Sequence, residues 1–334
     1  MSTPPRSPLA DATVRTALAT GLDEPSRPRL EQFSTFLANA FGPTAVALIH
    51  YGSHAHGAGA TAESAHDFFA IVDSYHDAYR SLAATVGTRY RPGVAALLNR
   101  VLPPNVIAVA DTNATPPARA KIAVLSLRAF RRACSPRSAD LFVRGRLFQV
   151  ARLVWARDDA SRRVVIDATI EARAGSFEWG RAFLRTPFDV ETYCRILLTM
   201  AFASEIRPET ADRIAGLLDV QRTSLHQMYA PLLTWFHRTG ALRQYGALYR
   251  VAATQGTWDT LASSVYMRRS KLRATLRWAK YVALYDDWLD YVVGKIARRS
   301  GVAIELSSRE RRWPLIFLWP KAIRFLRSRP QRQG

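Results

Sequence analysis

Two short motifs near the start of the chain have the residue types and the spacing that phosphate chemistry requires. Gly52 and Ser53 follow an apolar segment, residues 45–51, and Asp67 opens a second apolar segment, residues 67–73. A glycine turn after a buried strand exposes backbone N–H groups, and a phosphate can approach it because there is no Cβ atom. A carboxylate at the start of the neighbouring strand can hold the Mg²⁺ that neutralises phosphate charge. The pattern predicts a nucleotide site in which Gly52 and Ser53 contact phosphate and Asp67 is a catalytic metal ligand.

These motifs alone do not specify a nucleotide site. Gly-Ser pairs also occur in ordinary turns, and the loop lacks the Gly-Lys-Thr/Ser ending of a Walker motif. Nucleotidyltransferases usually carry two acids two residues apart, but Phe69 stands where the second acid would be. Asp73 cannot replace it, because six strand residues separate the two carboxylates by about 20 Å. Asp111 and Glu63 are the remaining candidates for a carboxylate that would join Asp67.

Histidines are concentrated in the same region. Five of the seven lie between His50 and His76, and the pair His54 and His56 raises the alternative of a zinc site. The sequence offers neither a cysteine pair nor a His-Glu-x-x-His helix to complete such a site. We therefore interpret these histidines as polar loop residues, of which one or two face the nucleotide.

The elements that must position these residues follow from hydrophobic periodicity. Apolar residues at helical spacing predict a helix over residues 29–41, and strand patterns recur up to about residue 160. Later segments are helical in pattern. The predicted strands are 45–51, 67–73, 106–110, 121–126 and 151–156, and the predicted later helices are 161–174, 189–206, 210–226 and 228–238. We expect a flexible N-terminal segment, 1–28, an α/β (α+β) domain with a mixed sheet, 29–160, a helical domain, 161–255, and a basic C-terminal region, 256–334.

Composition limits the class of protein and its partners. The 334 residues are 48% apolar, which is enough for a large core and excludes a disordered or fibrous protein. The net charge of +20 predicts anionic partners, and residues 268–334 hold 17 Lys and Arg against 5 Asp and Glu. Cys134 and Cys194 are too few for a disulfide framework, and we expect both to be buried in a reducing compartment.

A family resemblance joins these motifs. Four motifs occur in one order over about 110 residues: the Gly-Ser turn of HYGS at 50–53, the Asp-Phe strand DFFAIVD at 67–73, the strand from Lys121 to Ser126, and Gly145-Arg146-Leu147 before another strand. In this order they resemble the mitochondrial translocator assembly and maintenance protein family, with fainter similarity over roughly 45–240. Its members are peripheral phosphatidate cytidylyltransferases, and the C-terminal extension here favours a bacterial branch.

The resemblance implies a fold, a reaction and further site residues. It implies a nucleotidyltransferase domain followed by a helical, winged-helix-like domain, with Mg²⁺ as cofactor. The implied reaction transfers CMP from CTP to phosphatidic acid, giving CDP-diacylglycerol and pyrophosphate for phosphatidylglycerol and cardiolipin synthesis. Lys121 and Arg146 become catalytic candidates and Arg207 a phosphate-binding candidate. The structural alternatives are a solvated strand-end cation for Lys121, a tie between loops for Arg146, and a pair with Glu205 for Arg207. His54 departs from the family, which often has glycine there.

The C-terminal end predicts association with a membrane surface. WPLIFLWP, residues 313–320, is too short to span a bilayer, and cations recur every third residue after it. Aromatic rings suit the headgroup boundary and cations suit anionic lipid. The predicted membrane-binding residues are Trp313, Phe317, Trp319, Lys321, Arg324 and Arg327. The alternative is that this segment docks on the core of the protein.

These predictions place a peripheral enzyme on the cytoplasmic face of a bacterial inner membrane, or on the matrix side of a mitochondrial one. Two alternative functions remain open: a nucleotidyltransferase with another acceptor, and a basic nucleic-acid-binding protein. We expect no nucleic-acid partner, because the C-terminal aromatic residues are grouped in one block rather than interleaved with arginine.

Overall fold

The computed structural model describes residues 7–57, 64–87, 91–205, 209–253, 256–284 and 307–309. The chain divides into two compact units, Met1–Lys280 and Tyr281–Gly334. The contacts discussed below all lie within the first unit.

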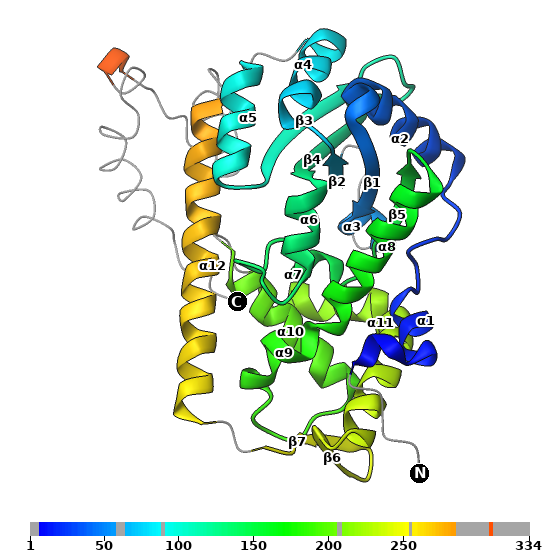
Figure 1. Ribbon diagram of the computed structural model, residues 1–334, viewed down its shortest axis with the longest axis vertical. Coiled ribbons are helices and arrows are strands. Elements are labelled where there is room, and N and C mark those ends of the chain that lie inside the picture. The colour runs from blue at the N-terminus through cyan, green and yellow to red at the C-terminus, as the bar shows by residue number, and fades with distance from the viewer. Residues whose placement is uncertain are drawn as a thin grey trace. The chain divides into compact units, whose positions relative to one another are not determined.

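A five-stranded mixed sheet forms the centre of the first unit, in the order β3-β4-β2-β1-β5 (Figure 1). The central pair β2 and β4 is parallel, and the other neighbours are antiparallel. The strands are β1 (Ala45–Tyr51), β2 (His66–Val72), β3 (Asn105–Asp111), β4 (Ala118–Ser126) and β5 (Arg152–Ala156). The predicted mixed sheet is confirmed, and each predicted strand lies at its expected place in the chain.

Helices cover both faces of this sheet. On one face lie α2 (Pro28–Phe41), α4 (Tyr75–Val86) and α5 (Pro92–Val101), and on the other α6 (Leu127–Cys134) and α8 (Asp159–Ala174). Successive strand residues point to opposite faces, so Phe68 packs against Phe33 of α2 while Phe69 packs towards Phe142. Every residue of β1 is buried because both faces of that strand are covered. Cys134 and Cys194 are buried and free, as expected.

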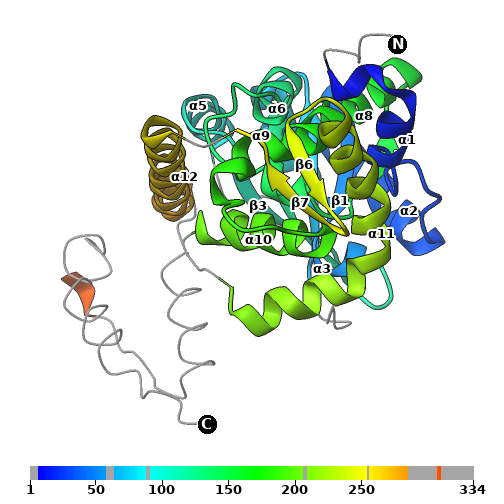
Figure 2. The same cartoon turned by 90° about the horizontal axis from the view of Figure 1, so that it is seen from below.

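The second half of the first unit is mainly helical. It contains α9 (Ser176–Gly180), α10 (Val190–Ala203), α11 (Ala211–Arg238) and α12 (Thr257–Leu284) up to Lys280. Figure 2 shows α10 and α11 beside the hairpin β6 (Leu242–Tyr245) and β7 (Leu248–Val251). The two helices predicted at 210–226 and 228–238 are one continuous helix, α11, with Pro231 inside it. The sequence did not predict this hairpin, because its two strands have four residues each and show little periodicity.

The sheet and these helices share one hydrophobic core. Short helices complete the unit at α1 (Ala12–Leu18), α3 (Ser53–His56) and α7 (Arg144–Leu147). The division of the chain at residues 160 and 255 stays a prediction.

Part of the segment 1–28, which was expected to be flexible, packs on the core. Val14, Leu18 and Leu22 are buried in the core, and α1 packs against α11. Asp11 caps α1 by accepting hydrogen bonds from two backbone N–H groups of its first turn. The many Pro, Ser and Thr residues favoured a prediction of flexibility. The docking of α1 was not predicted, because its partners lie far away in the chain.

Arg173 of α8 fastens this N-terminal segment to the core. Its guanidinium is fully buried and donates hydrogen bonds to the carbonyl oxygens of Leu18 at 2.6 Å and Thr20 at 2.9 Å. It also donates to the carbonyl oxygens of Leu147 at 3.0 Å and Gln149 at 3.2 Å. Burial lowers the pKa of Arg173 to about 10. One side chain thus joins three segments through their backbones.

We expect Arg173→Met to lower the free energy of unfolding by about 3 kcal/mol or more, because buried carbonyl groups lose their donors. Urea denaturation followed by circular dichroism measures the change. Arg162→Met is the matched control on the same helix, since Arg162 forms an exposed ion pair with Asp23 and should cost under about 1 kcal/mol. Equal losses in the two variants would contradict this role of Arg173.

Candidate nucleotide site

Gly52 and Asp67 lie next to each other at the end of the β1–β2 pair. Tyr51, the last residue of β1, pairs with Asp67 in the antiparallel register, so Gly52 follows directly beside it. Gly52 has a φ of +80°, which favours glycine, and a Cβ atom placed there would lie 2.6 Å from Asp67 Oδ2. Both its conformation and the space beside Asp67 therefore require glycine at this position. Ser53 begins the short helix α3 directly after it.

Lys121 occupies the neighbouring position on the other side of Asp67. β2 and β4 run parallel, and Asp67 is the register partner of Lys121. Register partners in a sheet project their side chains from the same face. Tyr51, Asp67 and Lys121 therefore form a row across three adjacent strands, on the face that carries Phe69 two residues further along β2.

Arg146 reaches the same end of the sheet from α7. Its guanidinium forms an ion pair with Glu205 at 2.7 Å and donates a hydrogen bond to the carbonyl oxygen of Phe142 at 2.8 Å. Its Cζ atom lies 3.8 Å from the centroid of the Phe142 ring and 6.0 Å from that of Tyr51. The side chain is 21% exposed. Arg146 thus does tie loops together, and it also lies beside the residues around Asp67.

The charged groups around Asp67 act on its pKa in opposite directions. Burial raises the pKa of the Asp67 carboxyl, whereas the charges of Lys121, Arg146 and His54 act to lower it. The carboxylate of Glu205 acts in the same direction as burial. Burial also raises the pKa of the Tyr51 hydroxyl, which therefore stays protonated at neutral pH. A half-hidden carboxylate surrounded by cations is an arrangement typical of functional sites.

Most of the histidine group does not belong to this site. His50 and His66 lie on the opposite face of the sheet, share a hydrogen bond of 3.1 Å between ring nitrogens and surround Phe68. Burial lowers the pKa of His50 to about 3 and that of His66 to about 4, so both rings are neutral at physiological pH. His54 stacks on His66 with ring centroids 4.0 Å apart and is the histidine that acts on Asp67. No group of three metal-ligating side chains occurs in the described ranges, which gives the zinc alternative no support there.

Two carboxylates weighed as partners of Asp67 lie away from it in the described structure: Asp73, which the sequence already excluded, and the candidate Asp111. Asp73 forms an ion pair with Arg157 at 2.5 Å, beyond the far end of β2. Asp111 ends the edge strand β3 and accepts a hydrogen bond from the backbone N–H of Asn113. The carboxylate that does influence Asp67 is Glu205. Sequence reasoning considered Glu205 only as a partner of Arg207, because nothing local marks a residue 138 positions away from Asp67.

Several predicted site residues lie outside the described ranges. Among them are Glu63 and the phosphate-binding candidate Arg207. The membrane-binding candidates Trp313, Phe317, Trp319, Lys321, Arg324 and Arg327 also lie outside them. Their assigned roles stay predictions.

The residues present fit a magnesium nucleotide. Mg²⁺ takes one or two protein carboxylates and completes its octahedron with water and substrate phosphate oxygens. Asp67 supplies one such carboxylate beside the space that a Cβ atom on Gly52 would fill. Lys121 and Arg146 would supply positive charge to the triphosphate of such a nucleotide. This combination suits a metal that arrives with its nucleotide better than a metal held by protein ligands alone.

Neither a scan against protein-family models nor a search of curated proteins found a match to this chain. The family resemblance therefore stays a prediction that rests on the quoted motifs.

We expect Asp67→Asn to leave the free energy of unfolding at pH 8 unchanged or to raise it. Because burial raises the pKa of Asp67 above 3.8, the folded state binds this proton more tightly than the unfolded chain does. Ionisation of Asp67 therefore costs stability as the pH rises through its folded-state pKa. In urea denaturation without Mg²⁺, the free energy of unfolding of the variant should rise relative to that of the wild type as the pH increases from 4 to 8. A variant less stable than the wild type by more than about 1 kcal/mol at pH 8 would oppose this reading.

Proposed function

We propose that this chain is a magnesium-dependent phosphatidate cytidylyltransferase, which transfers CMP from CTP to phosphatidic acid. The observation that carries the proposal is the convergence of Gly52, Asp67, Lys121 and Arg146 at one end of one sheet. Each of the four comes from a different motif of the resemblance, and nothing in the spacing of the motifs alone requires them to meet. The hairpin β6–β7 after α11 is also compatible with the winged-helix-like region that the resemblance implies.

The proposed reaction needs charge relief more than it needs a general base. The phosphate of phosphatidic acid has a second pKa of about 6, so its oxygen is already a nucleophile at neutral pH. This oxygen forms a bond to the α-phosphorus of CTP, and the bond from that phosphorus to the bridging oxygen breaks. Pyrophosphate leaves with the electron pair of the broken bond. Two anions must approach each other, so cations fixed near the reacting atoms lower the barrier.

The residues divide this task among them. Bound Mg²⁺ would neutralise part of the triphosphate charge. Asp67 would hold the metal, while the turn at Gly52 lets phosphate oxygens come close to the backbone. Lys121 and Arg146 would stabilise the charge that develops between the nucleophile and the pyrophosphate. Glu205 orients Arg146 through their ion pair at 2.7 Å.

α12 supports the proposed association with a membrane. Its exposed large apolar side chains follow a helical repeat along one side of the helix, opposite the buried Ser270 and Arg277. They are Trp258, which is 81% exposed, with Leu261, Val265, Leu272 and Leu276, and together we call them the apolar stripe. None of the described helices is long and apolar enough to cross a membrane.

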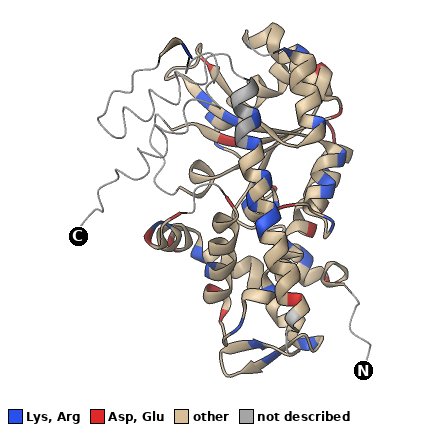
Figure 3. Ribbon diagram, turned by 90° about the vertical axis from the view of Figure 1, so that its left-hand side faces the viewer, with Lys and Arg blue, Asp and Glu red and all other residues tan. Residues whose placement is uncertain are grey.

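Basic residues accompany the apolar stripe. Arg268, Arg269 and Lys271 are exposed, and Asp259 is the sole acidic residue in the sequence of α12. Figure 3 is viewed from the side on which α12 lies, and it shows Lys and Arg residues at intervals along this helix. An apolar stripe flanked by cations is complementary to an anionic lipid surface. We therefore assign the stripe to the lipid headgroup region, with the predicted 313–327 segment as a second contact, on the cytoplasmic face of a bacterial inner membrane.

The activity is tested by incubating purified protein with Mg²⁺, phosphatidic acid in mixed micelles and each labelled nucleoside triphosphate. We expect a liponucleotide from CTP and an equal amount of pyrophosphate. Asp67→Asn should lower turnover by about 1,000-fold and Lys121→Ala by about 100-fold, each with little loss of thermal stability. Asp73→Asn is the matched control, because its carboxylate lies in an ion pair away from the site.

Two results would contradict the proposed activity. Near-normal turnover in Asp67→Asn would remove that residue from the catalytic role. Nucleotidyl transfer to a soluble acceptor, without any dependence on phosphatidic acid, would support the alternative enzyme.

The apolar stripe is tested by co-sedimentation with vesicles containing phosphatidylglycerol. We expect Leu272→Asp combined with Leu276→Asp to weaken binding at least about 10-fold, and added salt to weaken wild-type binding. Leu97→Asp on α5 is the control, since Leu97 is equally exposed but lies outside the stripe. If the double variant bound vesicles normally, the stripe would not be a lipid contact. Tighter binding to DNA than to vesicles would favour the nucleic-acid alternative.

A further inference from the structure

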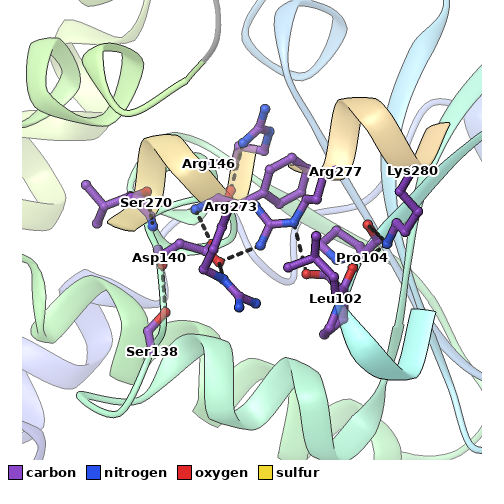
Figure 4. A network of polar contacts seen from close by, with 12 residues as sticks. Leu102, Pro104, Ser138, Asp140, Arg146, Ser270, Arg273, Arg277 and Lys280 are labelled. Carbon is purple, nitrogen blue, oxygen red and sulfur yellow. Dashed lines mark hydrogen bonds and ion pairs between the residues drawn. The ribbon is translucent and has the colours of Figure 1, made fainter. Parts of the chain in front are cut away.

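The inner face of α12 is joined to the loop that precedes α7 by one buried carboxylate, Asp140. Its Oδ2 atom accepts hydrogen bonds from Arg273 Nε at 2.6 Å and from Arg277 Nη2 at 2.5 Å (Figure 4). Its Oδ1 atom accepts the backbone N–H of Phe142 at 3.0 Å. Burial acts to raise the pKa of Asp140, but both guanidinium groups and the Phe142 N–H outweigh it and lower the pKa. Asp140 therefore stays ionised at neutral pH and fixes the loop to the helix.

Further hydrogen bonds join α12 to this loop and to the loop between α5 and β3. Ser270 Oγ of α12 accepts the backbone N–H of Leu141 at 3.0 Å. Arg277 Nε donates to the carbonyl oxygen of Pro103 at 3.0 Å, and Lys280 Nζ donates to that of Pro104 at 3.1 Å. Hydrogen bonds define a single geometry more narrowly than apolar packing does. These hydrogen bonds therefore fix the position of α12 along its axis and its rotation relative to the two loops.

Phe142 connects this interface to the candidate site. The Arg277 Cζ atom lies 4.9 Å from the centroid of the Phe142 ring, and the Arg146 Cζ atom lies 3.8 Å from the same centroid. The carbonyl oxygen of Phe142 also accepts a hydrogen bond from Arg146 Nη1 at 2.8 Å. The Phe142 ring also packs edge to face against the ring of Phe69, with centroids 6.3 Å apart. Phe69 follows Asp67 by two residues, so Phe142 lies where α12, Arg146 and the sheet meet.

Arg146 needs this support because an arginine side chain has several rotatable bonds and is repelled by nearby cations. Arg277 is close enough to Arg146 for each to feel the charge of the other. A guanidinium that must be ordered anew for each substrate contributes less to catalysis than one that is already in place. The contacts with Phe142 and Glu205 order it in advance.

We propose that Arg277 is a positioning residue for Arg146. Its guanidinium holds the Phe142 ring, and the ring and carbonyl group of Phe142 hold the guanidinium of Arg146 towards the nucleotide site. The role of Arg146 in this inference rests on the proposed function. The contacts themselves do not, so they can be tested apart from activity.

Arg273 provides a matched control. It donates to the same Asp140 oxygen as Arg277 and lies one helical turn away on the same face of α12. The described cation–ring contacts of Phe142 come from Arg146 and Arg277. Loss of either arginine therefore removes a bond to Asp140, but loss of Arg277 also removes the support of the ring.

The kinetic test compares initial rates of pyrophosphate release over a range of CTP concentrations. We expect Arg277→Gln to lower kcat by about 30-fold and to change KM for CTP by less than about 3-fold, because the lost interaction acts on the transition state. Arg273→Gln should lower kcat by less than about 3-fold. Arg277→Lys keeps a cation beside Asp140 and should restore part of the rate. Equal losses of kcat in Arg277→Gln and Arg273→Gln would overturn the inference.

A double-mutant cycle separates positioning from general damage. In a Phe142→Leu background Arg277→Gln should cost little more than Phe142→Leu alone, because the ring that transmits its effect is gone. Thermal unfolding identifies any variant that is simply unfolded, and Arg277→Lys with Phe142→Leu remain informative if Arg277→Gln fails to fold. Additive losses of kcat would show that Arg277 acts by another route.

The last measurement does not depend on activity. The Arg146 Nε–H resonance, assigned by its loss in Arg146→Lys, should be displaced by the ring current of Phe142. We expect Arg277→Gln to return it towards the position of a free arginine and Arg273→Gln to leave it in place. If the wild-type protein made no liponucleotide but showed this pattern, the proposed function would fail while the positioning role stood. An unchanged resonance in Arg277→Gln would overturn the positioning role itself.

Discussion

The candidate site depends on the pairing register of β1, β2 and β4. Side chains alternate between the two faces of a sheet, so a slip of one residue would exchange the faces of every residue in β2. The correct register buries Phe69 on the face that carries Phe142 and Phe68 against α2. Asp67 occupies the same face as Phe69, and thus the hydrophobic pattern that specifies the core also places the carboxylate beside Lys121. Packing energy in this way determines the geometry of a polar site.

The polar groups around this register are arranged at some cost to stability. A carboxylate half hidden from water and arginines close to one another are unfavourable until they are paired. Asp140 offsets the charge of Arg273 and Arg277, and Glu205 offsets that of Arg146. None of these described ion pairs involves Asp67. A carboxylate without such a pair fits the proposed role of Asp67, which is to hold a cation that arrives with its ligand.

The sequence predicted the elements that neighbouring residues determine, and it did not predict contacts between segments far apart in the chain. The five strands follow from short apolar runs and α2 from helical spacing, each over a few residues, and Gly52 with Asp67 marks the end of one strand pair. The docking of α1 could not be predicted, because it depends on Arg173, more than 150 residues away. Phe142 and Arg277 carry no motif, and their roles arise from contacts between distant segments. The single helix α11 was predicted as two with a break at residue 227, but Leu225 and Met228 on either side of that position are buried in one core and the helix continues through it.

The central claim is that Asp67, beside Gly52, Lys121 and Arg146, holds the metal of a magnesium nucleotide. Calorimetric titration of the wild-type protein and of Asp67→Asn with CTP, each with and without Mg²⁺, tests it most directly. We predict that the wild-type protein binds CTP markedly more tightly when Mg²⁺ is present and that Asp67→Asn loses this dependence. Equal affinity of both proteins for CTP, whether or not the metal is added, would contradict the account.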